Sequence, residues 1–128
     1  MSNNATRKVV LVGHCVPDSF MLKGVIEKAI PNANVVRANT DAELKAHAPG
    51  AALLVVNRVL DGEFADEAGF SIIRSFANAS PPTLLISNFP EALAEAEALG
   101  ARPGFGKKVA GSEDSANRLR AAVQDHTA

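Results

Sequence analysis

Unbroken apolar runs alternate along this chain with segments whose apolar residues recur every three or four positions. Three runs, at 8–13, 52–57 and 83–87, have the continuous apolar character of strands buried on both faces of a parallel sheet. A shorter run at 35–36 predicts another strand, and a weak fifth strand is expected around Phe105. The alternation of strands with helical segments predicts an α/β protein.

The first two segments between these runs are predicted to be helices. The first begins near Pro17, which suits a first helical turn because it has no N–H to leave unpaired, and ends at Pro31. Its apolar residues recur at helical spacing and form one stripe: Met21, Leu22, Val25, Ile26, Ala29 and Ile30. Thr40 and Glu43 form a capping box that begins a short second helix, which ends at 49–50.

Three more helices are predicted in the second half of the chain. The inward-facing residues expected on the third helix are Phe70, Ile73, Phe76 and Ala77. The fourth helix begins at Pro90 and is closed by Gly100, and the last is capped by Ser112. Five strand–helix units joined by right-handed crossovers give a parallel five-stranded sheet with helices on both faces.

Composition and charge indicate one globular domain. The chain has 128 residues, 47% hydrophobic and 21% charged, so we expect a single domain over 1–128 with tails at 1–6 and 125–128. The net charge of −1 gives no electrostatic reason to expect nucleic acid or an anionic membrane as a partner. The single cysteine forms no internal disulfide, and no apolar stretch has the length of a membrane span or a signal peptide. The prediction is therefore a cytoplasmic location.

The order of elements and several short stretches resemble the receiver domain of bacterial two-component response regulators. The segment 57–62 resembles the stretch at the family's phosphoacceptor, and 69–70 resembles the pair that opens its third helix. The segment 82–87 resembles its fourth strand, which ends on Thr or Ser, and 100–108 resembles its fifth-strand region. The resemblance covers nearly the whole chain. It implies a flavodoxin-like (βα)5 three-layer sandwich with strand order 2-1-3-4-5.

The family's reaction requires groups that this sequence lacks. Receivers take a phosphoryl group on a carboxylate, with Mg²⁺ held by that carboxylate and by an acidic pair after the first strand. The resemblance places Gly13 and His14 at the acidic pair and Asn57 at the acceptor, so three carboxylates are missing. Ser87 matches the family hydroxyl. Lys107 or Lys108 matches its phosphate-facing lysine, and the spacing from the preceding aromatic residue favours Lys108.

Other acidic residues lie near these positions in the sequence. Asp18 is expected at a helix N-terminus, where a carboxylate favours the helix dipole. The acids of the loop after the central strand are expected to be solvated: Asp61, Glu63, Asp66 and Glu67. Neither interpretation rebuilds a metal site from these carboxylates.

His14 and Cys15 are the most reactive neighbours in the sequence. Both are ligands that Zn²⁺ accepts, but adjacent residues on an extended chain point opposite ways and no second Cys or His cluster lies nearby, so we predict no metal site. Cys15 precedes a helix N-terminus, which favours an activated thiol. The alternative is a small buried side chain that packs at a strand end, and it is the one we expect.

We predict a non-phosphorylatable receiver-like module that is not an enzyme, has no cofactor, and acts in bacterial signalling through a protein partner or as a homodimer. The alternative is a sensor of a small ligand, a metal or thiol redox state, at the pocket formed where the strands end. Spaced glycines of a dinucleotide site, a Walker loop and a nucleophile elbow are all missing from the sequence.

The resemblance also indicates where a partner binds, because receivers commonly use the face of the fourth helix, fifth strand and last helix. The candidate interface residues there are Ala94, Ala98, Arg102, Phe105 and Arg118. Small residues on the fourth helix let another backbone approach, and Phe105, between two glycines, would be unshielded if it pointed outward. The alternatives are that the alanines only favour helix formation and that Phe105 fills the core.

Overall fold

The computed structural model describes residues 6–124. Its strands are β1 (Arg7–Val12), β2 (Ala33–Ala38), β3 (Leu53–Asn57), β4 (Thr83–Ile86) and β5 (Arg102–Phe105). Its helices are α1 (Val16–Ala29), α2 (Asp41–His47), α3 (Gly69–Ser75), α4 (Pro90–Ala98) and α5 (Glu113–Gln124), and a 3₁₀ turn spans Lys107–Val109. The alternation of strands and helices is the predicted one.

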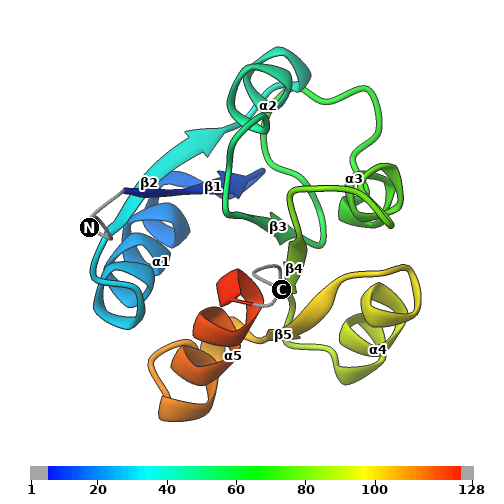
Figure 1. Ribbon diagram of the computed structural model, residues 1–128. Coiled ribbons are helices and arrows are strands. Elements are labelled where there is room, and N and C mark those ends of the chain that lie inside the picture. Colours follow the sequence, from blue (N-terminus) through cyan, green and yellow to red (C-terminus); the bar gives the residue numbers. More distant parts are fainter. Residues whose placement is uncertain (1–5, 125–128) are drawn as a thin grey trace.

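The five strands form one parallel sheet in the order β2-β1-β3-β4-β5 (Figure 1). The register pairs Val12 with Ala38 and with Val56, and Asn57 with Ile86. All the strands therefore end at one edge, which we call the carboxyl edge. The predicted flavodoxin-like order 2-1-3-4-5 is confirmed.

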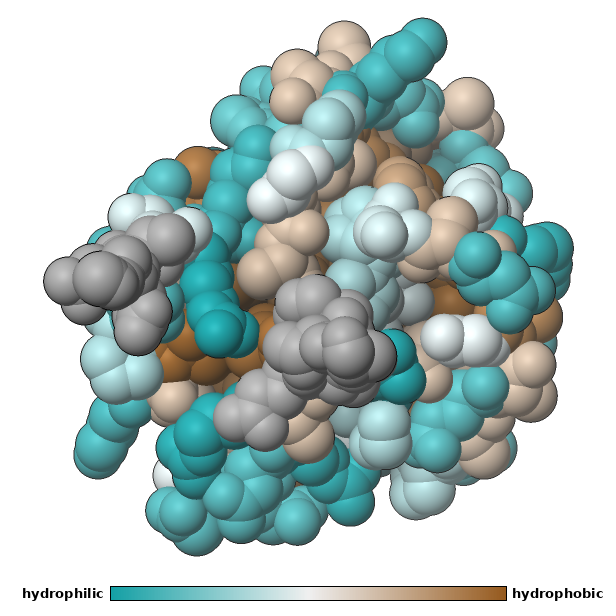
Figure 2. All heavy atoms as spheres, viewed as in Figure 1, coloured by the Kyte–Doolittle hydropathy of each residue, from teal (hydrophilic) through white to brown (hydrophobic). Residues whose placement is uncertain are grey.

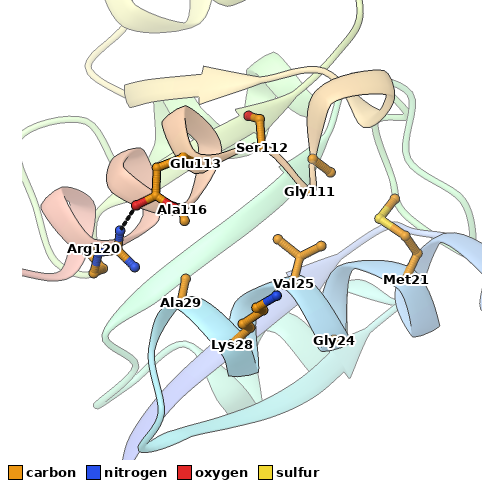
Figure 3. Close-up of a pocket in the computed structure, with 11 residues that line it drawn as sticks. Met21, Gly24, Val25, Lys28, Ala29, Gly111, Ser112, Glu113, Ala116 and Arg120 are labelled. Atoms are coloured by element: carbon orange, nitrogen blue, oxygen red, sulfur yellow. Dashed lines mark hydrogen bonds and ion pairs between the residues drawn. The ribbon is translucent and has the colours of Figure 1, made fainter.

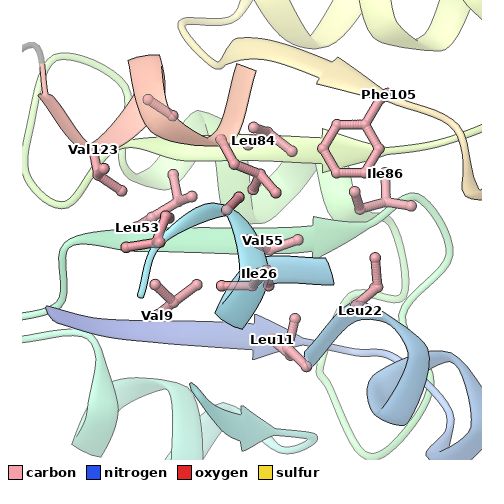
Figure 4. Packing of buried hydrophobic residues seen from close by; sticks show 14 of the residues in the cluster. Val9, Leu11, Leu22, Ile26, Leu53, Val55, Leu84, Ile86, Phe105 and Val123 are labelled. Atoms are coloured by element: carbon pink, nitrogen blue, oxygen red, sulfur yellow. The ribbon is translucent and has the colours of Figure 1, made fainter. Parts of the chain in front are cut away.

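Two hydrophobic clusters, one on each face of the sheet, make a three-layer sandwich. On one face α1 and α5 pack against alternate strand residues such as Val9, Val55 and Ile86 (Figure 4). On the other face α2, α3 and α4 pack against the intervening residues, such as Val10 and Leu54. Strand residues are buried from both sides, which explains why their sequences are continuously apolar.

The capping signals in the sequence have the geometry expected of them. The hydroxyl of Thr40 accepts a hydrogen bond from the Glu43 N–H at 3.0 Å at the start of α2. The hydroxyl of Ser112 accepts one from the Ser115 N–H at 3.1 Å at the start of α5. Gly100 follows α4 with a φ of +111°, a backbone conformation that favours glycine.

The predicted inner residues of α3 do pack on the core, with Ile73 buried and Phe70 and Phe76 partly buried against it, but the helix ends earlier than their stripe. The helix has only seven residues and ends at Ser75, so Phe76 and Ala77 lie beyond it and are half-buried. Its buried apolar residues are Ile72 and Ile73, and Phe70 is half-buried. A two-turn helix buries a short patch, and a stripe extrapolated over three turns overestimates it.

The surface is mainly polar. On the face shown in Figure 2, hydrophilic residues predominate and the most hydrophobic ones lie in recesses between them. Within residues 6–124, no helix combines the length and the apolar character needed to cross a membrane.

Candidate functional site

The candidate site begins in the loop after β1, where Gly13 has a φ of +74°. A Cβ atom at this position would overlap the side chain of Leu60 and crowd its backbone, so any residue other than glycine would be strained here. The carbonyl oxygen of Gly13 accepts hydrogen bonds from the Asn57 side-chain amide at 3.0 Å and from the Asp61 N–H at 2.9 Å. Gly13 thus joins the loops that follow β1 and β3.

Asn57 ends β3 and is half-buried. Its Nδ2 atom is the donor to the Gly13 carbonyl, a contact that a carboxylate at the same position could not make because it has no hydrogen to donate. At the position where the resemblance expects a metal-binding, phosphoryl-accepting carboxylate, the chain has a neutral side chain that bridges two loops.

His14 is completely buried beside these residues. Its Nε2 atom lies 2.9 Å from the Val55 carbonyl oxygen, which can only accept, so Nε2 carries the hydrogen. Burial lowers the pKa of His14 to about 4, and the positive charges of Lys107 and Arg37 add to the effect against the opposing hydrogen bond to Val55 and charge of Asp18. The imidazole is therefore neutral at pH 7, and its Nδ1 atom has no hydrogen-bond partner.

The sequence did not point to the residues that hold the His14 backbone. The carbonyl oxygen of His14 is approached by Arg37 Nη2 at 3.0 Å, Asn39 Nδ2 at 3.0 Å and Ser19 Oγ at 3.3 Å. Arg37 and Asn39 lie at the end of β2, the neighbour of β1. The sequence carried one signal for this contact: Arg37 and Asn39 are polar residues at the carboxyl end of the second predicted strand.

Lys107 and Asp18 form an ion pair on the other side of the site. Lys107 Nζ lies 2.6 Å from Asp18 Oδ2, and the two side chains are 33% and 28% exposed. The pKa of Asp18 is lowered, first by the hydrogen bond from Lys107, with smaller contributions from the Cys15 thiol and from the charges of Lys107 and His14. Asp18 does lie in the first turn of α1, as expected, but it also binds a lysine of the site.

The lysine that faces the site is Lys107, whereas the aromatic-to-lysine spacing favoured Lys108. Lys108 is exposed, and its backbone N–H donates to the Asn88 side chain at 3.2 Å. The backbone of Gly106 packs against Ser87 and Asn88 so closely that a Cβ would overlap them. The 3₁₀ turn therefore starts directly after Gly106 and directs the first lysine into the site.

Ser87 follows β4 and is buried, with its Oγ accepting a hydrogen bond from the Phe89 N–H at 3.1 Å at the start of α4. A cavity of about 240 Å³ lies beside it. Its lining residues are Asn57, Arg58, Val59, Ile86, Ser87, Asn88, Phe89 and Lys107. The structure therefore brings Asn57, Ser87 and Lys107 together around one small cavity.

Cys15 was expected to be buried, but it is partly exposed. It occupies the position before the first residue of α1, where the β1–α1 loop reaches the surface. The acids of the β3–α3 loop are exposed, as expected: Asp61, Glu63, Asp66 and Glu67. Within the part of the chain that the structure describes, no three His, Cys, Asp or Glu residues are grouped so that they could hold a metal ion.

Exposed apolar side chains surround this site. Among the described residues, the large hydrophobic side chains that are exposed are Val16, Phe20, Val59, Phe89 and Val109. All five follow the carboxyl ends of strands, in connecting loops, in the 3₁₀ turn or within the first two turns of α1. We call these five residues the apolar edge. The guanidinium of Arg58 lies 5.0 Å from the centre of the Phe89 ring, a cation–π contact.

The candidate interface on α4, β5 and α5 is only partly at the surface. Ala94 and Ala98 are exposed on α4. Phe105 is 3% exposed and lies in the core beside Ile86 (Figure 4), so the prediction that it contributes to an interface is wrong and its alternative holds. Arg102 is half-buried. Arg118 binds the Gly104 carbonyl at 2.6 Å and Asp114 at 3.0 Å, which ties α5 to β5.

Several solved structures with this arrangement are response regulators. A response regulator from Thermotoga maritima matches with a TM-score of 0.72 and 16% identity, over 93% of this chain and 98% of that one. The chain has the fold of a response-regulator receiver domain. A receiver domain from Rhodospirillum rubrum matches this receiver-like chain with a TM-score of 0.60 and 16% identity, over 88% of both chains. The signal receiver domain of a DNA-binding response regulator from Colwellia psychrerythraea 34H matches with a TM-score of 0.63 and 16% identity, over 81% and 87%.

Comparison of the sequence gives no further relatives. No protein-family model matches the chain, and no curated protein matches it. At 16% identity the likeness to solved structures establishes the fold, and function has to be argued from the site.

Proposed function

We propose that this chain is a receiver-like signalling module that does not accept a phosphoryl group and acts by binding another protein. The observation that carries the proposal is the hydrogen bond from the Asn57 amide to the Gly13 carbonyl. Phosphoryl transfer in a receiver requires an anionic carboxylate at this position, and here the position holds a neutral amide bonded to a neutral carbonyl.

The chemistry of the site supports this proposal from both sides. Mg²⁺ binds through oxygen ligands, preferably carboxylates. Gly13 has no side chain and the buried imidazole of His14 is neutral, so neither residue provides a carboxylate. Lys107, at the position of the phosphate-facing lysine, is paired with Asp18 in a partly exposed contact. Phosphorylation would also need a nucleophile and a metal site, and the site as folded offers neither.

Partner binding is supported by the apolar edge. Scattered exposed apolar residues are ordinary on protein surfaces, but large ones concentrated in one region favour a protein interaction site. In this chain all the described large ones follow the carboxyl ends of strands, and Val59 and Phe89 line the cavity beside Ser87. A surface that has lost its reaction but keeps exposed aromatic and aliphatic side chains is suited to contact with another protein.

Incubation with acetyl phosphate and Mg²⁺ tests the phosphoryl part of the proposal. We expect the intact mass to stay unchanged, while a phosphorylatable receiver domain treated in parallel gains a phosphoryl group. Asn57→Asp should also remain unmodified, because the new carboxylate loses the hydrogen bond to Gly13 and still lacks acidic partners for the metal. A hydroxylamine-sensitive adduct on the unaltered chain, at Asp18 or Asp61, would overturn the proposal.

A further inference from the structure

A groove runs between α1 and α5, on the face of the sheet opposite α4 (Figure 3). Its volume is about 490 Å³. The apolar side chains that line it are Met21, Val25, Ala29, Ala110 and Ala116. Gly24 also lines it, and a Cβ at Gly24 would meet no atom within 4 Å, so nothing fills the groove at this point.

Basic side chains stand on both walls of the groove. Lys28 is exposed on α1, and Arg120 extends from α5 on the opposite wall (Figure 3). Arg120 Nη2 lies 3.1 Å from Glu113 Oε2, but the Glu113 side chain is 83% exposed. Arg120 Nη2 also donates to Asn117 Oδ1 at 2.6 Å, a contact that is likewise exposed. Contacts so exposed to water contribute little, and Arg120 can exchange them for another carboxylate at small cost.

Helix α4 has the complementary character. Ala94 and Ala98 are one turn apart on its exposed side and form a narrow ridge. Exposed acids flank this ridge: Glu91, Glu95 and Glu97. The helix contains no basic residue. It therefore presents small apolar side chains between carboxylates, whereas the groove presents an apolar floor with Lys28 on one wall and Arg120, paired with the exposed Glu113, on the other.

We propose that α4 of one copy of this chain binds in the α1–α5 groove of a second copy. The alanine ridge enters the groove, where small side chains allow the helix to approach. The flanking carboxylates reach Lys28 on one wall and Arg120 on the other. This inference goes beyond the proposed function, because it uses surfaces other than the apolar edge and takes a second copy of the chain as the partner.

The position of the two surfaces determines the kind of assembly. Helix α4 lies on the face of the sheet opposite α1 and α5 (Figure 1), which form the groove. A pair of molecules therefore satisfies one contact and leaves one groove and one α4 unoccupied. Contacts of this head-to-tail type form open chains, or rings of three or more copies, instead of closed dimers. The contact is small, and we expect the average mass to rise over a range on the order of 10 µM to 1 mM.

Two variants, each blocking one surface, test this arrangement in the full chain. Ala94→Arg/Ala98→Arg puts large cations on the ridge. Gly24→Glu/Lys28→Glu makes the groove acidic, and since Gly24 lies in open space within a helix this change should not impair folding. Ala46→Arg and Lys45→Glu, both at exposed positions of α2, are the matched controls.

Sedimentation velocity measures the result. Each blocking variant alone should associate at least about tenfold more weakly than the controls, and so stay largely monomeric at concentrations where the controls associate. Adding 0.5 M NaCl should weaken the association of the controls. An equimolar mixture of the two variants should form a one-to-one pair and nothing larger, because each supplies the surface that the other has lost. Circular dichroism checks that both variants are folded.

Other outcomes overturn the inference. A mixture that stays monomeric, or a wild-type chain that is monomeric up to about 1 mM or stops at a dimer, excludes head-to-tail binding. These results leave the phosphoryl-transfer result untouched, since acetyl phosphate treatment is read by intact mass on the monomer. Failure of this inference and failure of the proposed function are therefore separately visible.

Discussion

The two halves of the candidate site are held together by different forces. On the β1–β3 side the contacts are neutral: a part-buried one between Asn57 and Gly13 and a buried one between His14 and Val55. On the β5 side a single ion pair, Lys107 with Asp18, joins two partly exposed side chains. Buried neutral hydrogen bonds are costly to break, whereas exposed ion pairs contribute little. The first half is thus a fixed part of the fold, and the second is an adjustable contact.

The largest expected effect is at Gly13. Gly13→Ala should lower the free energy of unfolding by about 3 kcal/mol or more, because of the positive φ and the overlap with Leu60. Urea denaturation measures the change. Gly111→Ala is the control, since its Cβ meets nothing within 4 Å. Equal stability of both variants would mean that the loop after β1 is adaptable and that the comparison above is wrong.

His14 should make the same half of the site sensitive to pH. Its pKa of about 4 in the folded chain lies below the ordinary value of 6.5, so the unfolded chain binds more protons between these values. Stability is full above about pH 6.5 and falls as the pH falls towards 4, with a loss of about 2 kcal/mol between pH 7 and pH 5.

His14→Gln, which keeps a side-chain N–H for the Val55 carbonyl but does not titrate, tests this account. The variant is expected to be less stable at pH 7, because glutamine differs in shape from the buried imidazole that it replaces. The comparison is therefore between the slopes of stability against pH and not between absolute stabilities. Urea denaturation at pH 7, 6 and 5 should show a shallower decline for the variant than for the wild type. Parallel declines would assign the acid sensitivity to other groups.

The smallest effect is expected on the ion-paired side. Asp18→Asn should change the free energy of unfolding by less than about 1 kcal/mol at pH 7, because both partners are partly exposed. The lowered pKa of Asp18 gives the sign with pH: its contribution is present at neutral pH and is lost as the pH falls through that pKa. Thermal melts in low and high salt should show the difference shrinking with salt. A loss as large as that for Gly13→Ala would make the ion pair part of the core.

The sequence pattern predicted the parts of the fold that depend on local signals. The strands β1, β3 and β4 are continuously apolar because helices cover both faces of the sheet, and Thr40 and Ser112 mark helix starts by their own side chains. These features require no knowledge of distant contacts. Asn57 was placed at the carboxyl edge for the same reason.

The remaining features depend on contacts between distant segments. The Lys107–Asp18 pair joins residues 89 positions apart, and no spacing rule predicts it. The choice of Lys107 over Lys108 follows from how closely Gly106 packs on the β4–α4 loop. Whether Phe105 pointed inward or outward was undecided because its two glycine neighbours give no periodicity to follow.

The three donors that share the His14 carbonyl oxygen have a consequence for motion. Ser19, Arg37 and Asn39 come from α1, from β2 and from the residue that follows β2, so the loop after β1 is attached to two neighbouring elements at one atom. Moving the loop alone would break all three contacts together, in a region that is otherwise buried. Its amide hydrogens should therefore exchange with solvent only in large-scale opening of the sheet, at rates far below those of ordinary surface loops.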